Sequence, residues 1–432
     1  MNREELRKHY EENMYGVWRE GEKVTYELLG PDKASENEEK PPFFFEVRGG
    51  ELVRVNVEAK GRKASFVFHA FLPKEKAGLK APGAEKKAAP ATPGSENKAD
   101  PVVSGAESGT EPVTANDPPT YPKGSPFIVC MHPIFPVEYA LSKGYALLVM
   151  DTREIASDDI NRKGAFYDLY PYTSDPAEQT GVLMAWAWGA SKILDAVLGE
   201  NGPQSGLDGM RGENGPQTGL CHLRGGLAQE FNLDPDAAMV TGVSRWGKAT
   251  AVCGAFDRRF RMSIPACSGA GGLALYNYFS EGKTYDFSSI GGPKEYTYTK
   301  NEPLDCLQSD AERGWFNDRF LAYKDPSQIP IDQENLLIMA MDKDRYTFVI
   351  AACMSEDWVN APSMWECFKK ADEAYKAAGL DDRLVAHFHR EGHAVLEEDM
   401  ALLIEYFDHM HYGMETKTPL ESLKTTVFAG QE

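Results

Sequence analysis

The sequence predicts an α/β protein with a mostly parallel central sheet that begins with antiparallel strands. Apolar runs of strand length alternate with segments of helix length over much of the chain, as in parallel sheets covered by helices on both faces. Three earlier runs within residues 43–73, one of them with alternating polarity, indicate an antiparallel entry. The length of 432 residues, with 42% apolar and 26% charged residues, suits a globular chain with a large core.

The opening runs are FFFEV, LVRVNVEA and ASFVFHAFLP. Further strands are expected at 126–133, 145–151, 237–243, 260–269, 346–355 and 384–390. Helices are expected at 175–198, from just after Ser244 through Gly254, and at 334–341, 363–379 and 393–411. An antiparallel entry followed by this alternation fits the α/β-hydrolase architecture, a three-layer sandwich.

The predicted domain organisation is one catalytic domain over residues 42–432, preceded by a helical or extended segment at 1–41. Residues 74–124 are rich in Lys, Glu, Ala, Pro, Gly and Ser, so we expect a low-complexity insertion that does not pack. Residues 199–227 contain the near-repeat GENGPQSGL and GENGPQTGL, which indicates a Gly-rich loop insertion.

Charge and composition exclude several classes of function. A formal net charge of −20 argues against a nucleic-acid partner, and the longest apolar run, VLMAWAW, is too short to span a membrane. The seven cysteines lack C-x-x-C spacing, which indicates neither a zinc site nor a disulfide framework and suits a reducing compartment. The charged N-terminus lacks the apolar region of a signal peptide, so we expect a cytoplasmic protein, or a secreted one whose leader has been removed.

The stretch VTGVSRWGKAT, residues 240–250, contains the candidate nucleophile. Ser244 directly follows a predicted buried strand and precedes a helix, as in the nucleophile elbow of hydrolases. The usual elbow is G-x-S-x-G, but here the second glycine is Gly247, one position late. On spacing alone, Ser244 is equally well explained as the N-cap of the helix.

A nucleophilic serine needs a base and an orienting acid. Among nine histidines, His393 in REGH follows a strand and opens the last helix, which makes it the candidate base. The segment SEDW ends the preceding strand, and there Asp357 is the first choice for the acid and Glu356 the second. A plain solvated turn is the alternative for these carboxylates. His387 and His389 are expected to be structural.

The stretch VTGVSRWGKATAVCGAFDRRF resembles the signature of glucuronoyl esterases, carbohydrate esterase family 15, whose elbow is G-x-S-R-x-G-K. AWAWGASKILD, SGAGG, WFNDRF and REGH agree in the same order, so the resemblance covers about residues 126–411. The late second glycine is normal in this family. The family has the α/β-hydrolase fold.

The resemblance implies roles for individual residues. Ser244 would be the nucleophile, His393 the base, and Arg245 a stabiliser of the oxyanion. The residues implied to bind the sugar are Lys248, Glu312, Trp358 and, more weakly, Gln308, with Trp315 beside them in WFNDRF. Taken singly, Lys248 could be a solvated helix lysine, and either tryptophan could be a core residue.

One position departs from the family. Fungal members carry the acid as a glutamate after the strand that follows the elbow helix, and here that position is Cys267. A thiol cannot balance the charge of an imidazolium as a carboxylate can. Many bacterial relatives place the acid after the next strand, which agrees with Asp357 or Glu356.

These observations lead us to expect a serine esterase that cleaves esters of (4-O-methyl-)glucuronic acid, as found in lignin–carbohydrate or glucuronoxylan linkages. The expected substrate is a carbohydrate, and neither a metal nor an organic cofactor is expected. The alternatives are another carbohydrate esterase, such as an acetyl xylan esterase, and a non-catalytic carbohydrate-binding relative.

Overall fold

The computed structural model describes residues 1–33, 47–74, 119–132, 135–199 and 226–431. Within these ranges nine strands form one sheet in the order β1-β2-β3-β5-β4-β6-β7-β10-β11, and β8 and β9 form a separate ribbon. The strands are β1 Lys23–Pro31, β2 Glu51–Ala59, β3 Arg62–Phe71, β4 Ser125–Cys130, β5 Ala146–Met150, β6 Leu233–Val243, β7 Met262–Ala266, β8 Thr284–Tyr285, β9 Tyr296–Thr297, β10 Tyr346–Met354 and β11 Leu384–Glu391.

The large sheet has an antiparallel part and a parallel part. β1, β2 and β3 pair antiparallel, and β3 pairs antiparallel with β5. From β5 to β11 the pairings across the sheet are parallel. The structure therefore confirms the predicted, mostly parallel sheet with antiparallel N-terminal strands.

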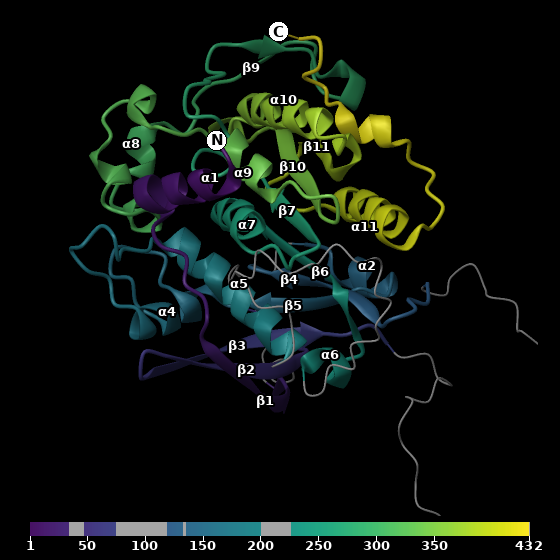
Figure 1. The fold of residues 1–432 in the computed structure, drawn as a ribbon. Coiled ribbons are helices and arrows are strands. Elements are labelled where there is room, and N and C mark those ends of the chain that lie inside the picture. Colours follow the sequence, from purple (N-terminus) through teal and green to yellow (C-terminus); the bar gives the residue numbers. More distant parts are fainter. Residues whose placement is uncertain (34–46, 75–118, 133–134, 200–225, 432) are drawn as a thin grey trace, which may run out of the picture.

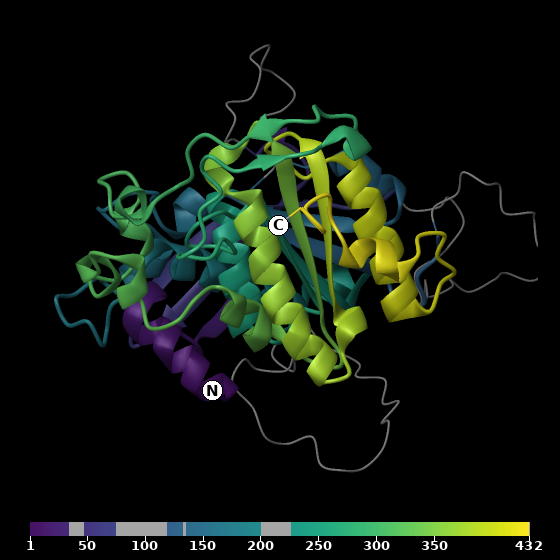
Figure 2. The same cartoon turned by 90° about the horizontal axis from the view of Figure 1, so that it is seen from above.

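Helices cover both faces of this sheet. They are α1 Arg3–Tyr10, α2 Val137–Ser142, α3 Thr152–Ile155, α4 Ala165–Leu169, α5 Val182–Leu198, α6 Leu227–Glu230, α7 Arg245–Phe256, α8 Leu304–Leu307, α9 Glu334–Ala340, α10 Ala361–Ala377 and α11 Glu397–Tyr412. In Figure 1, α5, α7 and α10 lie on one face, and α2 and α11 lie on the other. Figure 2 shows α10 and α11 on opposite sides of β10 and β11. This is the expected three-layer α/β-hydrolase sandwich.

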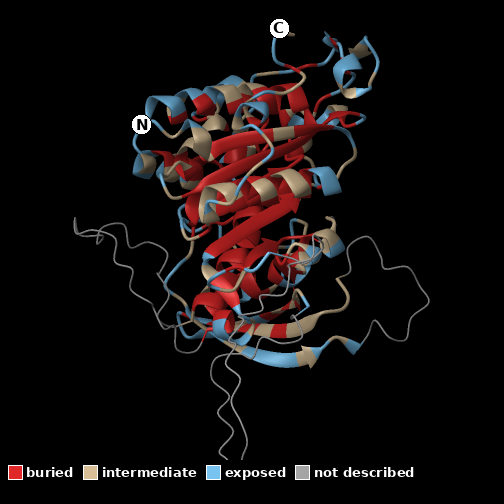
Figure 3. Ribbon diagram, turned by 90° about the vertical axis from the view of Figure 1, so that its right-hand side faces the viewer, coloured by how far each residue is buried: buried red, intermediate tan, exposed pale blue. Residues whose placement is uncertain are grey.

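The core lies in the middle of the sheet. Every residue of β5, β7 and β10 is buried, whereas the edge strand β1 has no buried residue. Figure 3 shows the central strands as a continuous buried layer. A strand buried on both faces must be apolar along its whole length, which is why these strands stand out in the sequence.

The register of the parallel strands brings their carboxyl ends to one edge of the sheet. Ala266 at the end of β7 is paired with Val243 at the end of β6 and with Ile350 of β10. Met354 at the end of β10 is paired with Glu391 at the end of β11. The segments that follow these strands therefore leave the sheet side by side, and a site is expected at this edge.

The N-terminal segment is more closely joined to the domain than its separate assignment at 1–41 suggests. β1 extends the large sheet by pairing with β2. The hydroxyl of Tyr10 in α1 donates to the backbone oxygen of Asp332 at 2.8 Å. Residues 43–46 of the predicted strand FFFEV and most of both insertions lie outside the described residues.

Two helices begin later than predicted, at Val182 and Glu397 rather than at 175 and 393. Before Val182, the chain uses its backbone to bind the N-terminal segment: Gly181 N donates to Tyr15 O at 2.8 Å. Before Glu397, the N–H of Leu396 donates to the carboxylate of Asp399 instead of continuing a helix backward. None of the described helices is long and apolar enough to cross a lipid bilayer.

Candidate active site

Ser244 lies in a sharp turn between β6 and α7. Its backbone has φ 62° and ψ −126°, a conformation that strains a non-glycine residue by on the order of 1–3 kcal/mol. Its N–H donates to Ala266 O at 3.0 Å. The side chain makes no capping hydrogen bond to α7, so the N-cap alternative does not explain this serine. A strained strand-to-helix turn at the carboxyl edge of the sheet is the geometry that exposes a nucleophilic hydroxyl.

The two glycines near Ser244 are required by close backbone contacts. A Cβ atom on Gly242 would lie 2.6 Å from Trp246 O, and one on Gly247 would lie 2.2 Å from Ala266 O. Neither separation leaves room for a side chain. The second glycine falls three residues after Ser244 because it is at Gly247 that α7 touches the end of β7.

The position that would be glycine in G-x-S-x-G is Trp246. Its indole Nε1 donates to Thr152 Oγ1 at 2.8 Å. Its ring stacks on that of His132, with 3.9 Å between the ring centroids. Trp246 is buried, and its contact with His132 packs the start of α7 against the segment that follows β4.

His393 and Glu356 meet at the carboxyl ends of β10 and β11. Each lies two residues beyond the paired residues Met354 and Glu391. The carboxylate of Glu356 contacts Nδ1 of His393. Neither of these two atoms has a hydrogen bond to any other described residue. Glu356 is buried, and the His393 side chain is 27% exposed, so the ring is held from one side and open on the other.

The carboxylate of Asp357 binds residues of a neighbouring loop instead of His393. Its carboxylate accepts hydrogen bonds from Tyr296 Oη at 2.6 Å and from the N–H and Oγ1 of Thr299 at 2.8 and 2.7 Å. The turn at Ser355, with φ 66°, sends the two consecutive acids in different directions. The structure thus corrects the expected order of preference: Glu356, not Asp357, contacts His393.

Cys267 follows β7, at the edge of the sheet where Glu356 also lies. It is buried, and its N–H donates to Ile350 O at 2.8 Å. Burial raises the pKa of the thiol well above its usual range, and the charges of Asp399 and Glu356 add to this effect. The thiol is therefore protonated and inert at neutral pH.

Arg245, the first residue of α7, is held by an acid that no sequence motif indicates. Its Nη1 lies 2.5 Å from Asp158 Oδ2. The other oxygen of Asp158 accepts from Trp315 Nε1 at 2.7 Å, and the guanidinium lies 5.4 Å from the centroid of the Trp315 ring. Asp158 therefore fixes both side chains. Its position shortly after β5, at the active edge of the sheet, was the only signal in the sequence.

Lys248 is one helical turn beyond Ser244 and is buried rather than solvated. Its ammonium donates to Ser268 O at 2.8 Å and to Glu302 Oε2 at 3.0 Å. The side chains of Lys248 and Glu302 are only 5% and 9% exposed. The ammonium also lies 5.6 Å from the centroid of the Trp315 ring. Glu302 was not found from the sequence, because nothing in the motif points to it.

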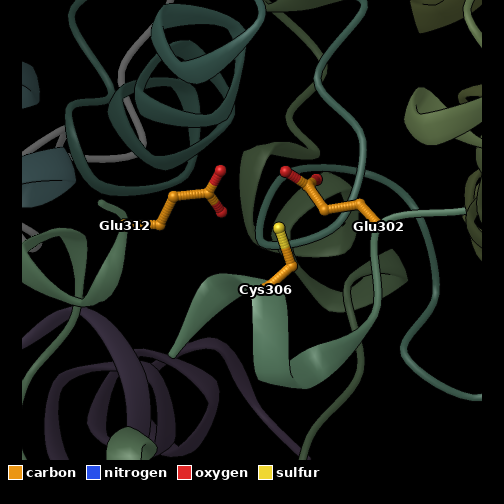
Figure 4. A group of neighbouring side chains, drawn as sticks. All are labelled: Glu302, Cys306 and Glu312. Carbon is orange, nitrogen blue, oxygen red and sulfur yellow. The ribbon is translucent and has the colours of Figure 1, made fainter. Parts of the chain in front are cut away.

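Glu312 faces Glu302 across the thiol of Cys306 (Figure 4). One carboxylate oxygen of Glu312 is buried and has no hydrogen-bond partner among the described residues. Burial, and next the charge of Glu302, raise the pKa of Glu312 to about 7, against the opposing charges of Lys248 and Arg245. Glu312 therefore exchanges its proton near neutral pH.

The same three residues are the one group among the described residues that could hold a metal ion. The candidate ligand atoms of Glu302, Cys306 and Glu312 lie within 4.8 Å of one another. Burial and the two carboxylates raise the pKa of Cys306 to about 11. A cation would have to displace the thiol proton and compete with the Lys248 ammonium, so the donor set suits a proton better than a resident metal.

The remaining predicted residues differ in their surroundings. Trp358 is 46% exposed, and its ring centroid lies 5.6 Å from that of His393. Trp315 is buried beside Arg245 and Lys248. The amide nitrogen of Gln308 donates to two backbone oxygens, Phe320 O and Tyr323 O, so this side chain braces a loop.

Comparison with known proteins finds several esterases that are similar to this chain. Residues 102–211 and 226–379 match a family model described as "Glucuronyl esterase, fungi". The chain is 47% identical over 312 residues to a multidomain esterase of Ruminococcus flavefaciens, which covers 71% of this chain and 37% of the relative. It is 27% identical to a 4-O-methyl-glucuronoyl methylesterase of Hypocrea jecorina, over 51% of this chain and 38% of the relative. The chain thus spans less than two fifths of the length of these two curated relatives.

Solved structures agree with these matches. A carbohydrate esterase family 15 glucuronoyl esterase from Caldicellulosiruptor kristjansonii superposes with a TM-score of 0.69 at 26% identity, over 98% of this chain and 87% of that one. The catalytic domain of the Hypocrea jecorina glucuronoyl esterase, at 19% identity and a TM-score of 0.60, shares the fold. Because the family model matches more than half of the chain, the chain belongs to the glucuronoyl esterase family, as its elbow motif predicts.

Proposed function

We propose that this protein is a serine esterase that hydrolyses esters of (4-O-methyl-)glucuronic acid carried on plant carbohydrate. The observation that carries the proposal is the elbow itself. A strained Ser244 is followed on one short helix by Arg245 and Lys248, with the His393–Glu356 pair at the same edge of the sheet. Ser244 provides the nucleophile. Arg245 and Lys248 provide positive charge next to it, for an acyl group that carries sugar hydroxyls.

The first half of the reaction forms an acyl-enzyme. Ser244 Oγ attacks the uronoyl carbonyl carbon while its proton passes to Nε2 of His393, and Glu356 balances the resulting imidazolium. The carbonyl oxygen becomes an oxyanion, which the Arg245 guanidinium and the N-terminal backbone N–H groups of α7 stabilise. The tetrahedral intermediate then collapses: the bond to the alcohol oxygen breaks, and His393 returns its proton to that alcohol.

The second half uses water in place of the serine. A water molecule gives its proton to His393 and attacks the acyl carbon. Collapse of the second intermediate breaks the bond to Ser244 Oγ, which recovers the proton from His393. The products are the alcohol and free glucuronic acid, and the enzyme is restored without a metal or cofactor in any step.

Recognition of the sugar is assigned to the neighbouring polar cluster. Lys248 and Glu312 supply a donor and a titratable carboxyl for sugar hydroxyls, and Trp358 presents an exposed indole next to His393. A flat aromatic surface suits the apolar face of a pyranose ring. An acetyl ester would leave these groups without partners, which favours a uronoyl acyl group over acetate.

The test compares hydrolysis of benzyl glucuronate with that of acetylated xylose and p-nitrophenyl acetate by the wild type and Ser244→Ala. We expect kcat/KM on the glucuronate ester to exceed that on acetyl esters by at least about a hundredfold, the discrimination that unpaired polar groups can give. Labelling by a fluorophosphonate should occur in the wild type and be absent in Ser244→Ala.

Each contrary result has a defined meaning. Faster hydrolysis of acetyl esters would replace the proposal with an acetyl xylan esterase. Equal labelling of wild type and Ser244→Ala, or none in the wild type, would leave a non-catalytic carbohydrate-binding relative.

A further inference from the structure

The loop that carries His393 is tied at both ends to one buried carboxylate. Asp399, in the first turn of α11, accepts from Leu396 N at 2.7 Å. On the other side of the loop, His389 near the end of β11 places Nδ1 2.9 Å from Asp399 Oδ2. Both side chains are fully buried, at 0% exposure. The short segment 390–395 is thus closed into a loop by a single acid.

His389 also makes a second contact, with the backbone of this loop. Its other ring nitrogen, Nε2, lies 2.8 Å from the backbone oxygen of Gly392, the residue before His393. Gly392 has φ 120°, a conformation that suits glycine and turns the chain toward the site. The imidazole ring of His389 therefore bridges Asp399 and the backbone next to His393.

The contacts of the His389 ring with Asp399 and with Gly392 O determine its protonation state. A carboxylate and a backbone carbonyl can only accept hydrogen bonds. A neutral imidazole has one N–H, so one of its nitrogens would turn a lone pair toward an oxygen in a site closed to water. Only the imidazolium, with two N–H groups, satisfies both contacts of His389.

The groups around His389 favour this charged form. His387 also contacts Asp399, with Nδ1 2.7 Å from Oδ1, and Glu398 lies next to Asp399 on α11. Burial opposes the charge, but Asp399, the Gly392 carbonyl and Glu398 outweigh it and raise the pKa of His389 above its ordinary value. The nearby thiol of Cys267 is neutral, because burial raises its pKa.

We propose that His389 is a positioning residue whose imidazolium clamps Gly392 to Asp399 and so holds His393 in place for the reaction. Loss of its proton opens the Gly392 contact and loosens the His393 loop. Because the charged form predominates below its pKa, the clamp is complete at low pH and is lost as the pH rises through that value. Loss of the His389 proton therefore sets the alkaline limb of the pH profile of kcat.

The kinetic test rests on the proposed esterase function. It measures the pH profile of kcat on benzyl glucuronate for wild type, His389→Gln and Asp399→Asn, with His409→Gln near the far end of α11 as the matched control. Glutamine cannot titrate, so we expect His389→Gln to lose the alkaline limb and to lower kcat about tenfold through misplacement of His393. Asp399→Asn removes the charge that retains the proton and should move the limb down by at least about one pH unit.

A second measurement does not depend on the substrate. NMR of protein labelled with ¹⁵N-histidine should show two protected imidazole N–H protons for His389 at neutral pH, assigned by their absence in His389→Gln. A single N–H signal at pH 6–7, or an alkaline limb unchanged in both variants, would overturn the clamp. If glucuronate esters are not hydrolysed at all, the proposed function fails, while the NMR result still decides the state of His389.

Discussion

Two histidine–carboxylate pairs lie within a few residues of each other, and their surroundings give them opposite roles. In His393–Glu356 the polar contact that the described residues make with the ring is to Nδ1, and the side chain is 27% exposed. In His389–Asp399 both ring nitrogens face acceptors and nothing is exposed. A catalytic base must gain and lose a proton in every turnover, which requires an open nitrogen. The comparison shows that burial and the number of occupied nitrogens, rather than the pairing itself, separate the two roles.

Of the substitutions that test this comparison, the largest effect is expected in the His393–Glu356 pair. His393→Ala should reduce kcat by on the order of 10⁴-fold, because members of a triad act as a unit, while the fold is retained. The measurement is steady-state hydrolysis of benzyl glucuronate, with thermal unfolding to check stability. His409→Gln serves as the control and should keep wild-type activity. Residual activity above a tenth of the wild type would remove His393 from the mechanism.

The two adjacent acids provide a matched pair of variants. Glu356→Gln should lower kcat by at least about a hundredfold, since the imidazolium loses its counter-charge. Asp357→Asn alters only hydrogen bonds to Tyr296 and Thr299, so we expect it to change stability more than kcat. Parallel kinetics and denaturant unfolding of both variants decide the matter. The reverse ranking in kcat would restore Asp357 as the acid.

A smaller effect on kcat is expected at Asp158, which holds the proposed oxyanion stabiliser Arg245. Asp158→Asn removes the charge that holds Arg245 but keeps an oxygen that can accept from Trp315. We expect kcat to fall about tenfold with little change in KM, because misplacement of a cationic donor weakens the transition state most. Asp168→Asn, at an exposed acid on α4, is the control. An unchanged kcat in Asp158→Asn would show that Arg245 needs no such support.

The smallest expected effect is a change of KM with pH, caused by protonation of Glu312. With its pKa raised to about 7, this carboxyl is neutral below that pH and charged above it, so KM should change across neutrality. Glu302→Gln removes a neighbouring negative charge and should shift this inflection to lower pH while kcat stays within about twofold. Because the folded-state pKa is raised, Glu312 also stabilises the fold less as the pH rises from its ordinary value toward 7. A KM independent of pH in both proteins would contradict this account.

The sequence predicted the sheet wherever strands are buried on both faces, as in β5, β7 and β10. It missed β1, because Lys23–Pro31 has no buried residue and so carries no continuous apolar run. Three site residues could be found from the sequence. The elbow motif contains Ser244 and Lys248, and His393 follows the end of a predicted strand. Asp158 and Glu302 could not be found, because they reach the site from loops distant in the sequence. The choice between Glu356 and Asp357 depended on one backbone angle at Ser355, which no residue pattern reveals.

The placement of Gly247 against Ala266, with Trp246 stacked on His132, bears on protein engineering. An elbow from a G-x-S-x-G hydrolase would put glycine where this chain has an indole, and a side chain where it has none. The seven-residue motif is therefore not a portable module. Grafting it onto another hydrolase would require the end of β7, Thr152 and His132 to be transferred with it.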